Sequence, residues 1–306
     1  MHLLPTSLRY FQEVARTGSI AVAADTLHVS ASAISRQVAA LERQMGVALF
    51  ERHARGMDLT APGRLLLSHV RRTGKEGARL IEELRTLSTS RRQVLRVASC
   101  EGLARRRIPE ALCLFQQEHP DVDIRLTVLP SAFATHRVQE GEADVAAVYA
   151  IAPPRDISVF ASFPAPAHAV LPRKTGEGLY GEPIPLAALC EYPLALSSQG
   201  ITQRELFDLA VGMEGLTPRI AMETDHVGVL MEFVRSGTGA TLLSHFALDQ
   251  ETDDFATLRA IDHPVLGQRH AQVHLPPPGD RKTWAEAFAA HLATVLAAHP
   301  LKQGLG

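Results

Sequence analysis

Short hydroxyl side chains and guanidinium groups recur on one side of a predicted helix near the start of the chain. In the stretch SASAISRQVAALERQM, which begins at residue 30, Ile34, Val38 and Leu41 follow one another at helical steps of four and three. If these three point inward, the opposite side carries groups that donate hydrogen bonds to base edges and phosphate oxygens. The alternative is the solvated face of an ordinary helical bundle. The predicted DNA-contacting residues on this helix are Ser30, Ser32, Ser35, Arg36 and Arg43.

Two further helices and a hairpin would position this face. Apolar residues at helical spacing mark a first helix, which Gly18 ends, and Ser19 and Ser30 are placed to cap the second and third helices. Two helices joined by a turn of three or four residues form a helix-turn-helix. The stretch VALFERHARGMDLT then predicts two strands around a basic turn. Because arginines on such a wing can lie along a DNA backbone or enter the minor groove, Arg52 and Arg55 join the predicted DNA-binding residues.

A long helix is predicted over residues 61–92, with Thr60 and Pro62 at its start. Gly74 and Gly77 weaken it as an isolated helix, so we expect a second copy of the chain to support it. The alternative is a spacer without a partner. The apolar seam expected to pair the two copies contains Leu66, Val70, Gly77, Ile81, Leu84 and Leu87.

Charge is distributed unevenly along the 306 residues. Residues 1–93 carry 14 Lys and Arg against 8 Asp and Glu, whereas the rest carry 17 against 25. A basic head on an acidic body is typical of a nucleic-acid-binding module joined to a different kind of domain.

The first part of the chain resembles the LysR-type transcriptional regulators. The resemblance rests on LRYFQEVARTGSIAVAADTLHVSASAISRQVAALERQMGVALFER, residues 8–52, followed by LTAPGRLLL. One departure is Ala31, which stands where the family usually has glutamine. The resemblance implies a homodimer or homotetramer that binds double-stranded DNA at an interrupted palindromic operator, with RNA polymerase as a further partner. It also implies a winged helix-turn-helix domain at 1–60, a dimerising linker helix at 61–92 and a two-lobed effector-binding domain at 93–306 that resembles periplasmic solute-binding proteins.

After residue 92, strands alternate with helices of about ten residues, which predicts parallel sheets and an α/β fold. Strand patterns such as QVLRVAS and ADVAAVYA alternate with the helical pattern IPEALCLFQQEHP. The proline-rich segment ISVFASFPAPAHAV is expected to cross between lobes. We therefore expect lobe I at about 93–163 and 264–300 and lobe II at about 164–263.

Ligands of such sheets bind at the carboxyl ends of strands, where helix N-termini offer free N–H groups. Ser99, Ser131 and Thr202 each follow a predicted strand, and simple helix capping is the alternative role for each hydroxyl. By the resemblance, Ser99 and Ser131 also match positions that line the effector pocket in relatives that bind small carboxylates. We expect a small anionic effector, such as an organic acid. The predicted pocket residues are Ser99, Cys100, Ser131, Ile201, Thr202, Val227 and Thr241.

Other classes of protein are less well supported. The sequence has no H-E-x-x-H, G-x-S-x-G or P-loop motif. We therefore expect that the protein is not an enzyme and that it binds no metal and no cofactor. A solute-binding protein that serves a transport system would lack the basic head and would need a secretion signal. A redox sensor acting through Cys100, with Cys190 as the resolving thiol, is the main alternative.

Two smaller predictions concern surface and compartment. Cys113 is expected in the core. The run Arg105, Arg106 and Arg107 is interpreted as a solvated face, with two alternatives: it gathers an anionic effector, or it pairs with acidic groups on a neighbouring subunit. The absence of a C-x-x-C motif, of a long apolar run and of a signal pattern predicts a cytoplasmic protein.

Overall fold

The computed structural model divides into two compact units, residues 1–91 and 92–306. It describes residues 3–53, 56–89, 92–152, 154, 156–174, 179–248, 254–279 and 281–300. Within these ranges no helix is both long and apolar enough to cross a membrane.

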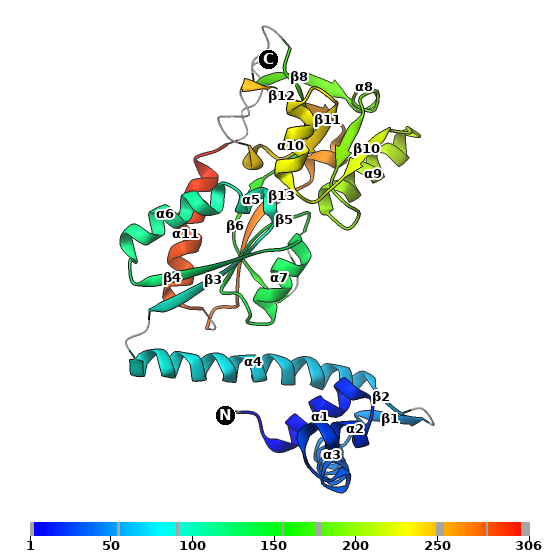
Figure 1. Ribbon diagram of the computed structural model, residues 1–306, viewed down its shortest axis with the longest axis vertical. Coiled ribbons are helices and arrows are strands. Elements are labelled where there is room, and N and C mark those ends of the chain that lie inside the picture. Colours follow the sequence, from blue (N-terminus) through cyan, green and yellow to red (C-terminus); the bar gives the residue numbers. More distant parts are fainter. Residues whose placement is uncertain are drawn as a thin grey trace. The chain divides into compact units, whose positions relative to one another are not determined.

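The first unit contains the predicted three helices and hairpin (Figure 1). Its elements are α1 (Thr6–Thr17), α2 (Ile20–Leu27), α3 (Ala31–Met45), β1 (Phe50–His53), β2 (Gly56–Leu59) and α4 (Ala61–Thr89). Gly18 ends α1 at a φ of 65°, and the hydroxyls of Ser19 and Ser30 accept hydrogen bonds from the first turns of α2 and α3, as predicted. The turn between α2 and α3 places His28 in the left-handed region, at a φ of 55°.

Several hydrogen bonds and one close backbone approach join the hairpin of this unit to its helices. One oxygen of the Glu42 carboxylate accepts hydrogen bonds from the backbone N–H groups of Leu49 at 2.8 Å and Phe50 at 3.2 Å, which ties α3 to β1. Thr60 accepts a hydrogen bond from the N–H of Gly63 and thereby caps α4. A Cβ atom on Gly63 would overlap the carbonyl oxygen of Leu49. Glu42, Thr60 and Gly63 therefore hold the hairpin against the two helices that flank it.

The glycines of α4 have a contact inside their own chain. A Cβ atom on Gly74 would lie 2.9 Å from the side chain of Leu4, and one on Gly77 would lie 3.1 Å from that of Leu3. These glycines therefore make room for the residues that precede α1. The expectation that a second copy of the chain supports α4 stays a prediction.

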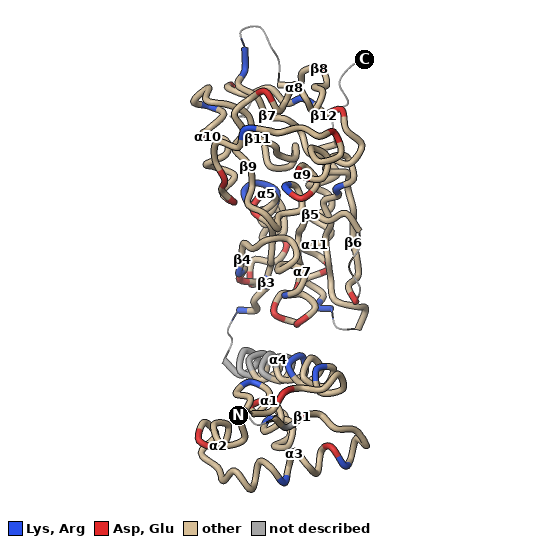
Figure 2. The backbone as a smooth tube through the Cα atoms, turned by 90° about the vertical axis from the view of Figure 1, so that its right-hand side faces the viewer, with Lys and Arg blue, Asp and Glu red and all other residues tan. Residues whose placement is uncertain are grey.

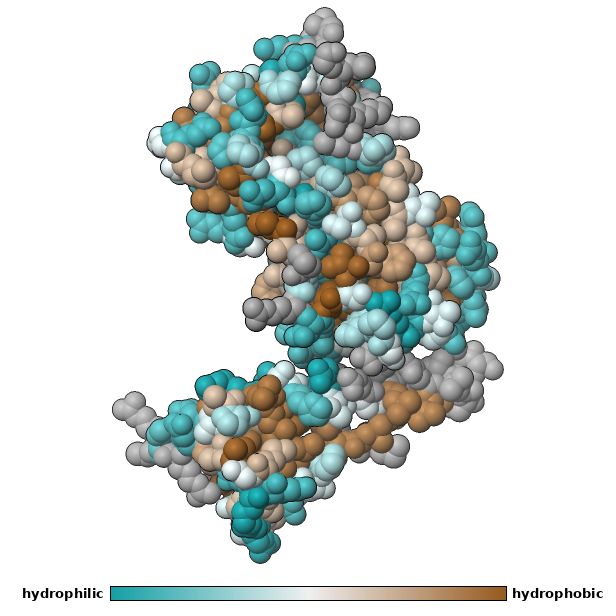
Figure 3. Space-filling model, turned by 180° about the vertical axis from the view of Figure 1, so that it is seen from behind, coloured by the Kyte–Doolittle hydropathy of each residue, from teal (hydrophilic) through white to brown (hydrophobic). Residues whose placement is uncertain are grey.

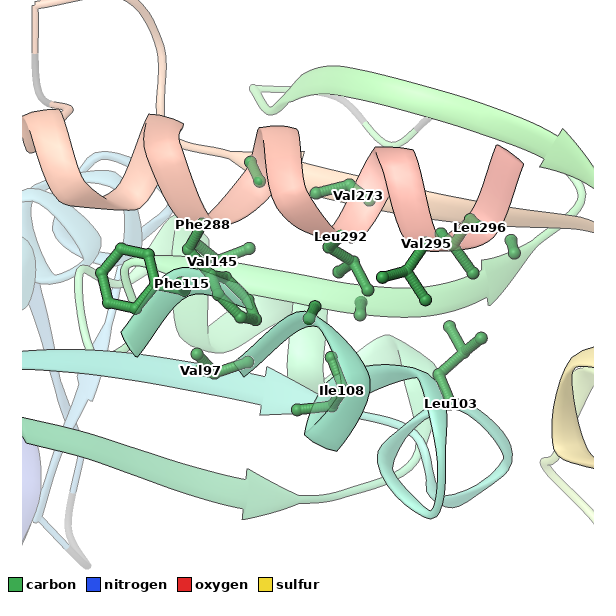
Figure 4. Close-up of a cluster of buried hydrophobic side chains, with 14 of the residues drawn as sticks. Val97, Leu103, Ile108, Phe115, Val145, Val273, Phe288, Leu292, Val295 and Leu296 are labelled. Atoms are coloured by element: carbon green, nitrogen blue, oxygen red, sulfur yellow. The ribbon is translucent and has the colours of Figure 1, made fainter. Parts of the chain in front are cut away.

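The second unit contains two sheets, each with its own core. The first sheet and its helices are called lobe I and have the strand order β4-β3-β5-β13-β6. Helices α6 and α11 cover one face and α7 covers the other (Figure 1). Phe115 of α6 packs edge-on against Phe288 of α11 in the larger core (Figure 4). The elements of lobe I are β3 (Gln93–Ser99), α5 (Glu101–Ala104), α6 (Arg107–Glu118), β4 (Val122–Val128), α7 (Ser131–Gln139), β5 (Val145–Ala150), β6 (Ser158–Pro164), β13 (His270–Leu275) and α11 (Thr283–Ala297).

Lobe II is built on the sheet β10-β9-β11-β7-β12-β8, with α9 packed on one face and α10 on the other. Its strands are β7 (His168–Pro172), β8 (Tyr180–Pro185), β9 (Leu194–Leu196), β10 (Ile220–Glu223), β11 (Ala240–Leu243) and β12 (Ala256–Asp262). Its helices are α8 (Leu186–Leu189), α9 (Thr202–Glu214), α10 (Val227–Arg235) and the short 3-10 turns η1 (His245–Ala247) and η3 (Pro264–Gly267).

The chain crosses between the lobes after β6 and again before β13. The expectation of parallel sheets is right for β3, β4 and β5 and wrong for the returning strands. β13 runs antiparallel to β5 and β6, and β7 runs antiparallel to β11 and β12. A strand that re-enters a lobe from the other lobe arrives at the opposite end of the sheet, so both sheets are mixed.

The arginine run at 105–107 divides between surface and core. Arg107 is only 4% exposed, and its guanidinium donates hydrogen bonds to the carbonyl oxygens of Phe246 at 3.1 Å and Leu248 at 3.0 Å. Its interpretation as a solvated or anion-gathering residue is therefore wrong. Cys113 lies on the exposed side of α6, so its prediction as a core residue is also wrong.

The Gly63 contact leads to a stability prediction. Gly63→Ala should destabilise the first unit by about 1–3 kcal/mol, since overpacking against a backbone carbonyl forces the hairpin away from α4. Trp284, the single tryptophan, lies in α11 of the second unit. In urea, the helical circular dichroism transition of the variant should shift while the Trp284 fluorescence transition stays at its wild-type midpoint.

Gly212→Ala is the matched control, because a Cβ atom there meets nothing within 4 Å. That change should be neutral or slightly stabilising in the last turn of α9, which ends at Glu214. An unchanged circular dichroism transition in Gly63→Ala would show that the hairpin does not press against α4.

Candidate DNA-binding surface and effector cavity

The predicted DNA-contacting residues on α3 lie on its solvent side. Ser30, Ser32, Arg36 and Arg43 are exposed and Ser35 is half-buried, whereas Ile34, Val38 and Leu41 are in the core. Neither Arg36 nor Arg43 makes a hydrogen bond or ion pair within the described part of the chain, so both guanidinium groups are available to a ligand. Basic positions on α3 are visible in Figure 2.

The hydroxyls at the start of α3 have a local role as well. Ser30 accepts a hydrogen bond from the N–H of Ala33 and lies 3.1 Å from the hydroxyl of Ser32. Ala31, at the first position of the helix, is exposed. The first turn of α3 therefore presents small polar groups rather than long side chains.

The wing forms the predicted antiparallel hairpin, in which Phe50 pairs with Leu59 and His53 with Gly56. Arg52 belongs to β1, although the position of its side chain is outside the described features. Arg55 lies outside the described residues altogether.

A cavity of about 350 Å³ opens between the two lobes of the second unit. This is large enough for a small organic ligand. Its wall is formed by residues 100–102, 128–132 and 149 from lobe I, by residues 197, 200–203, 205, 225–227, 243, 244 and 247 from lobe II and the segment that follows β11, and by residue 269 before β13.

Five of the seven predicted pocket residues line this cavity, namely Cys100, Ser131, Ile201, Thr202 and Val227. The hydroxyls of Ser131 and Thr202 do not cap α7 and α9. Ser131 instead accepts a hydrogen bond from the N–H of Tyr149 at 3.1 Å. The capping alternative therefore does not explain why a hydroxyl stands at either position.

Ser99 and Thr241 are not part of the wall. Both are fully buried, and their hydroxyls donate to backbone carbonyls inside the sheets, Ser99 to Ala147 at 3.1 Å and Thr241 to Ala195 at 2.6 Å. The prediction that these two residues line the pocket is therefore wrong. A hydroxyl at the end of a strand can point into the sheet as well as toward the edge where a ligand binds.

The sequence analysis missed Arg269, which contributes to the cavity wall while being only 2% exposed. Its Nε donates to the carbonyl oxygen of Ala165 at 3.1 Å, and its Nη1 donates to the Gln203 side chain at 2.7 Å. The guanidinium also lies over the ring of Tyr149, 4.3 Å from the centroid. Its Nη2 has no hydrogen-bond partner among the described residues. No motif marks this arginine, since it lies in an interlobe crossing whose position depends on the topology of both sheets.

Three carboxylates also line the cavity. Glu101 of α5 accepts a hydrogen bond from the N–H of Val227 at 2.9 Å, so it reaches from lobe I to the start of α10 in lobe II. Asp225 accepts a hydrogen bond from the N–H of Ser198 at 3.0 Å. Glu205 is exposed, and its carboxylate has no partner within the described ranges.

Burial controls the ionisation of the groups at the inner end of the cavity. Burial raises the pKa of the Cys100 thiol and that of the Tyr149 hydroxyl, and it lowers the pKa of Arg269. At neutral pH the thiol and the phenol are therefore uncharged. Arg269 remains protonated because its ordinary pKa is so high.

Two family models account for both units of the chain. Residues 5–64 match the model described as bacterial regulatory helix-turn-helix protein, lysR family, and residues 88–297 match the LysR substrate binding domain. The chain belongs to the LysR family. It is a DNA-binding transcriptional regulator with an effector-binding domain, and it is not an enzyme.

Individual relatives span most of this LysR-family chain. It is 30% identical over 254 residues to the RuBisCO operon transcriptional regulator of Allochromatium vinosum, covering 83% of each protein. It is 25% identical over 300 residues to the HTH-type transcriptional regulator CysB of Burkholderia cenocepacia, covering 97% of this chain and 95% of that protein.

Solved structures share the fold. A variant of full-length OxyR from Pseudomonas aeruginosa matches with a TM-score of 0.60 at 19% identity, covering 99% of both chains. CbnR in complex with its target DNA matches with a TM-score of 0.57 at 23% identity, covering 94% of this chain and 98% of that one.

The burial of Cys100 leads to a prediction about its reactivity. Because the thiolate is the reactive form, a raised pKa and a buried sulfur should make Cys100 react with a maleimide at pH 7 at least about tenfold more slowly than the exposed Cys113. Peptide mass spectrometry of a labelling time course measures both rates.

Unfolding in urea provides the control, since both thiols should then react at similar rates. Equal rates in the folded protein would contradict the prediction and would favour a sensor that acts through Cys100.

Proposed function

We propose that this LysR-family regulator reads an interrupted palindromic operator with α3 in the major groove and the hairpin beside it. In this proposal residues 1–60 bind DNA, residues 61–92 join subunits and residues 93–306 sense a ligand. Support comes from the unpaired guanidinium groups of Arg36 and Arg43 on the side of α3 that faces away from its core. The hydroxyls of Ser30, Ser32 and Ser35 near the helix start are close enough in sequence to contact neighbouring bases.

Subunit pairing is proposed for α4. Leu80 is 48% exposed and Leu84 is 53% exposed on this helix, and Ile81 beside them is half-buried. Hydrophobic surface is visible along the described part of α4 in Figure 3. Leucines exposed in a row on one long helix favour association with another helix, and we infer a homodimer or a homotetramer.

The regulatory ligand is proposed to be a small anion in the cavity between the lobes. The observation that carries this proposal is the buried Arg269 in the cavity wall, with one nitrogen that lacks a partner in the described structure. A ligand there would contact both lobes and would stabilise the arrangement of subunits that fits it best. Regulation then follows if the two arrangements of the oligomer bind the ligand with different affinity. Such a protein acts on DNA inside the cell, with RNA polymerase as a further partner.

The redox alternative is less well supported. Cys100 lines the cavity, but its thiol is protonated at neutral pH, and Cys190 packs against the core of lobe II and is not part of the cavity wall. The two thiols thus lie in the cores or walls of different lobes, and both are free cysteines in the structure.

The DNA-binding face is tested with Arg36→Ala. Loss of one guanidinium contact should weaken operator binding by about 1–3 kcal/mol, which is roughly fivefold to more than a hundredfold in Kd. A gel-shift titration at several salt concentrations measures this. Arg125→Ala is the matched control, since Arg125 is exposed on β4 in the other unit and the net charge changes equally. Equal affinities of the two variants would remove Arg36 from the interface.

Ligand sensing is tested by thermal unfolding in the presence of small carboxylates. A ligand that binds only the folded second unit should raise its stability by about 2.7 kcal/mol at one hundred times Kd, by mass action. The Trp284 fluorescence midpoint should therefore rise, while the circular dichroism transition of the first unit should not move. If no carboxylate in the panel moves the Trp284 midpoint, the anionic effector is wrong.

A further inference from the structure

Arg269 has no acidic counterpart in the structure described. Its pKa is influenced by Tyr149 and Cys100, and both of these groups are uncharged at neutral pH. Its hydrogen bonds go to the carbonyl oxygen of Ala165 and to the amide of Gln203, which are neutral acceptors. An uncompensated buried charge is strongly unfavourable in a folded protein. The Tyr149 ring, 4.3 Å away, compensates the charge in part, and an anion from outside the chain would be the first charged partner of the guanidinium.

The other charged groups of the same cavity have the opposite sign. Glu101, Glu205 and Asp225 contribute carboxylates to the wall, and the only protein donors to them in the described structure are two backbone N–H groups. His226, the nearest imidazole, lies 3.8 Å from Glu101 and is largely exposed. The cavity is thus cationic at a buried point and anionic where it is more exposed.

This distribution of charge limits which charged groups a bound ligand can carry. A dicarboxylate that places one group on Arg269 would bring its second negative charge toward the acidic side, where like charges repel. A ligand with a cationic second group would be attracted there. The same wall also contributes apolar surface from Leu129, Ile201 and Val227.

We propose that the effector is a small zwitterion of the amino-acid type, whose carboxylate binds Arg269 and whose ammonium group faces Glu205 and Asp225. This inference rests on the proposed function, namely that a small anion regulates the protein from this cavity. It adds a second requirement, a positive charge within a few bonds of the carboxylate.

The experiment compares matched ligands that differ by one group. Each amino acid of an aliphatic series is measured beside the acid that lacks its ammonium group and the amine that lacks its carboxylate, for example leucine, 4-methylpentanoate and 3-methylbutylamine. Isothermal titration calorimetry with the full-length protein gives each Kd, and the Trp284 midpoint confirms binding to the second unit. At least one amino acid should bind about tenfold more tightly than both of its counterparts.

Two variants and one control test which side chains bind the two charges of the ligand. Glu205→Gln should reduce the preference for the amino acid over its deaminated acid by about fivefold, as expected for one partly exposed ion pair. Glu191→Gln should leave the preference unchanged, since Glu191 is exposed and outside the cavity. Arg269→Lys, first checked for a wild-type Trp284 transition without ligand, should weaken both acids together because the fork of donors is lost.

The outcomes separate the two proposals. If deaminated acids bind as tightly as the amino acids, the zwitterion is wrong and the anionic effector stands. If the amines bind as tightly as the amino acids, Arg269 is not the anchor. If no carboxylate of either series binds, the anionic effector fails and the zwitterion fails with it.

Discussion

The geometry of the second unit depends on one buried guanidinium, that of Arg107. It extends from α6 of lobe I and donates to two carbonyl oxygens in the segment that follows β11 of lobe II. Charge-assisted hydrogen bonds in a low dielectric are strong, and these join the lobes at the level of the cavity. The segment that accepts these bonds includes Ala247 and is preceded by Ser244, and both residues line the cavity together with Cys100.

Two buried arginines in the same unit are therefore used differently. Arg107 has a carboxylate partner, Glu110, at 2.8 Å, together with its carbonyl partners. Arg269 has an amide and a carbonyl, and one nitrogen without a protein partner in the described structure. The first arrangement includes a charged partner within the chain, whereas the second includes none among the described residues. Because both side chains are almost inaccessible, this contrast in partners, rather than burial, is the reason for proposing Arg269 as the ligand-binding arginine.

Local patterns were sufficient to predict the first unit. Helical periodicity, a glycine stop and two serine caps act over a few residues, and they predicted the end of α1 and the starts of α2 and α3 correctly. The cavity was only partly predictable, because Ser131 and Thr202 follow strands while Arg269 comes to them through a crossing between sheets. The role of Gly74 and Gly77 was only partly predictable for a similar reason. Leu3 and Leu4, which pack against them, lie about seventy residues earlier in the chain, and helix propensity does not reveal that contact.

The turn at Gly18 has a consequence for how the protein meets DNA. The N–H of Met57 in the hairpin donates to the carbonyl oxygen of Gly18 at 2.8 Å, and Glu42 joins the other strand to α3. Hydrogen bonds thus join both strands of the hairpin to the helices. If α3 and the hairpin both contact DNA as proposed, the protein sets the spacing of these contacts, and an operator that does not match it must bend or twist to fit. The energy of doing so varies with the base steps, so part of the sequence preference would reside in the stiffness of the DNA, at base pairs that no side chain touches.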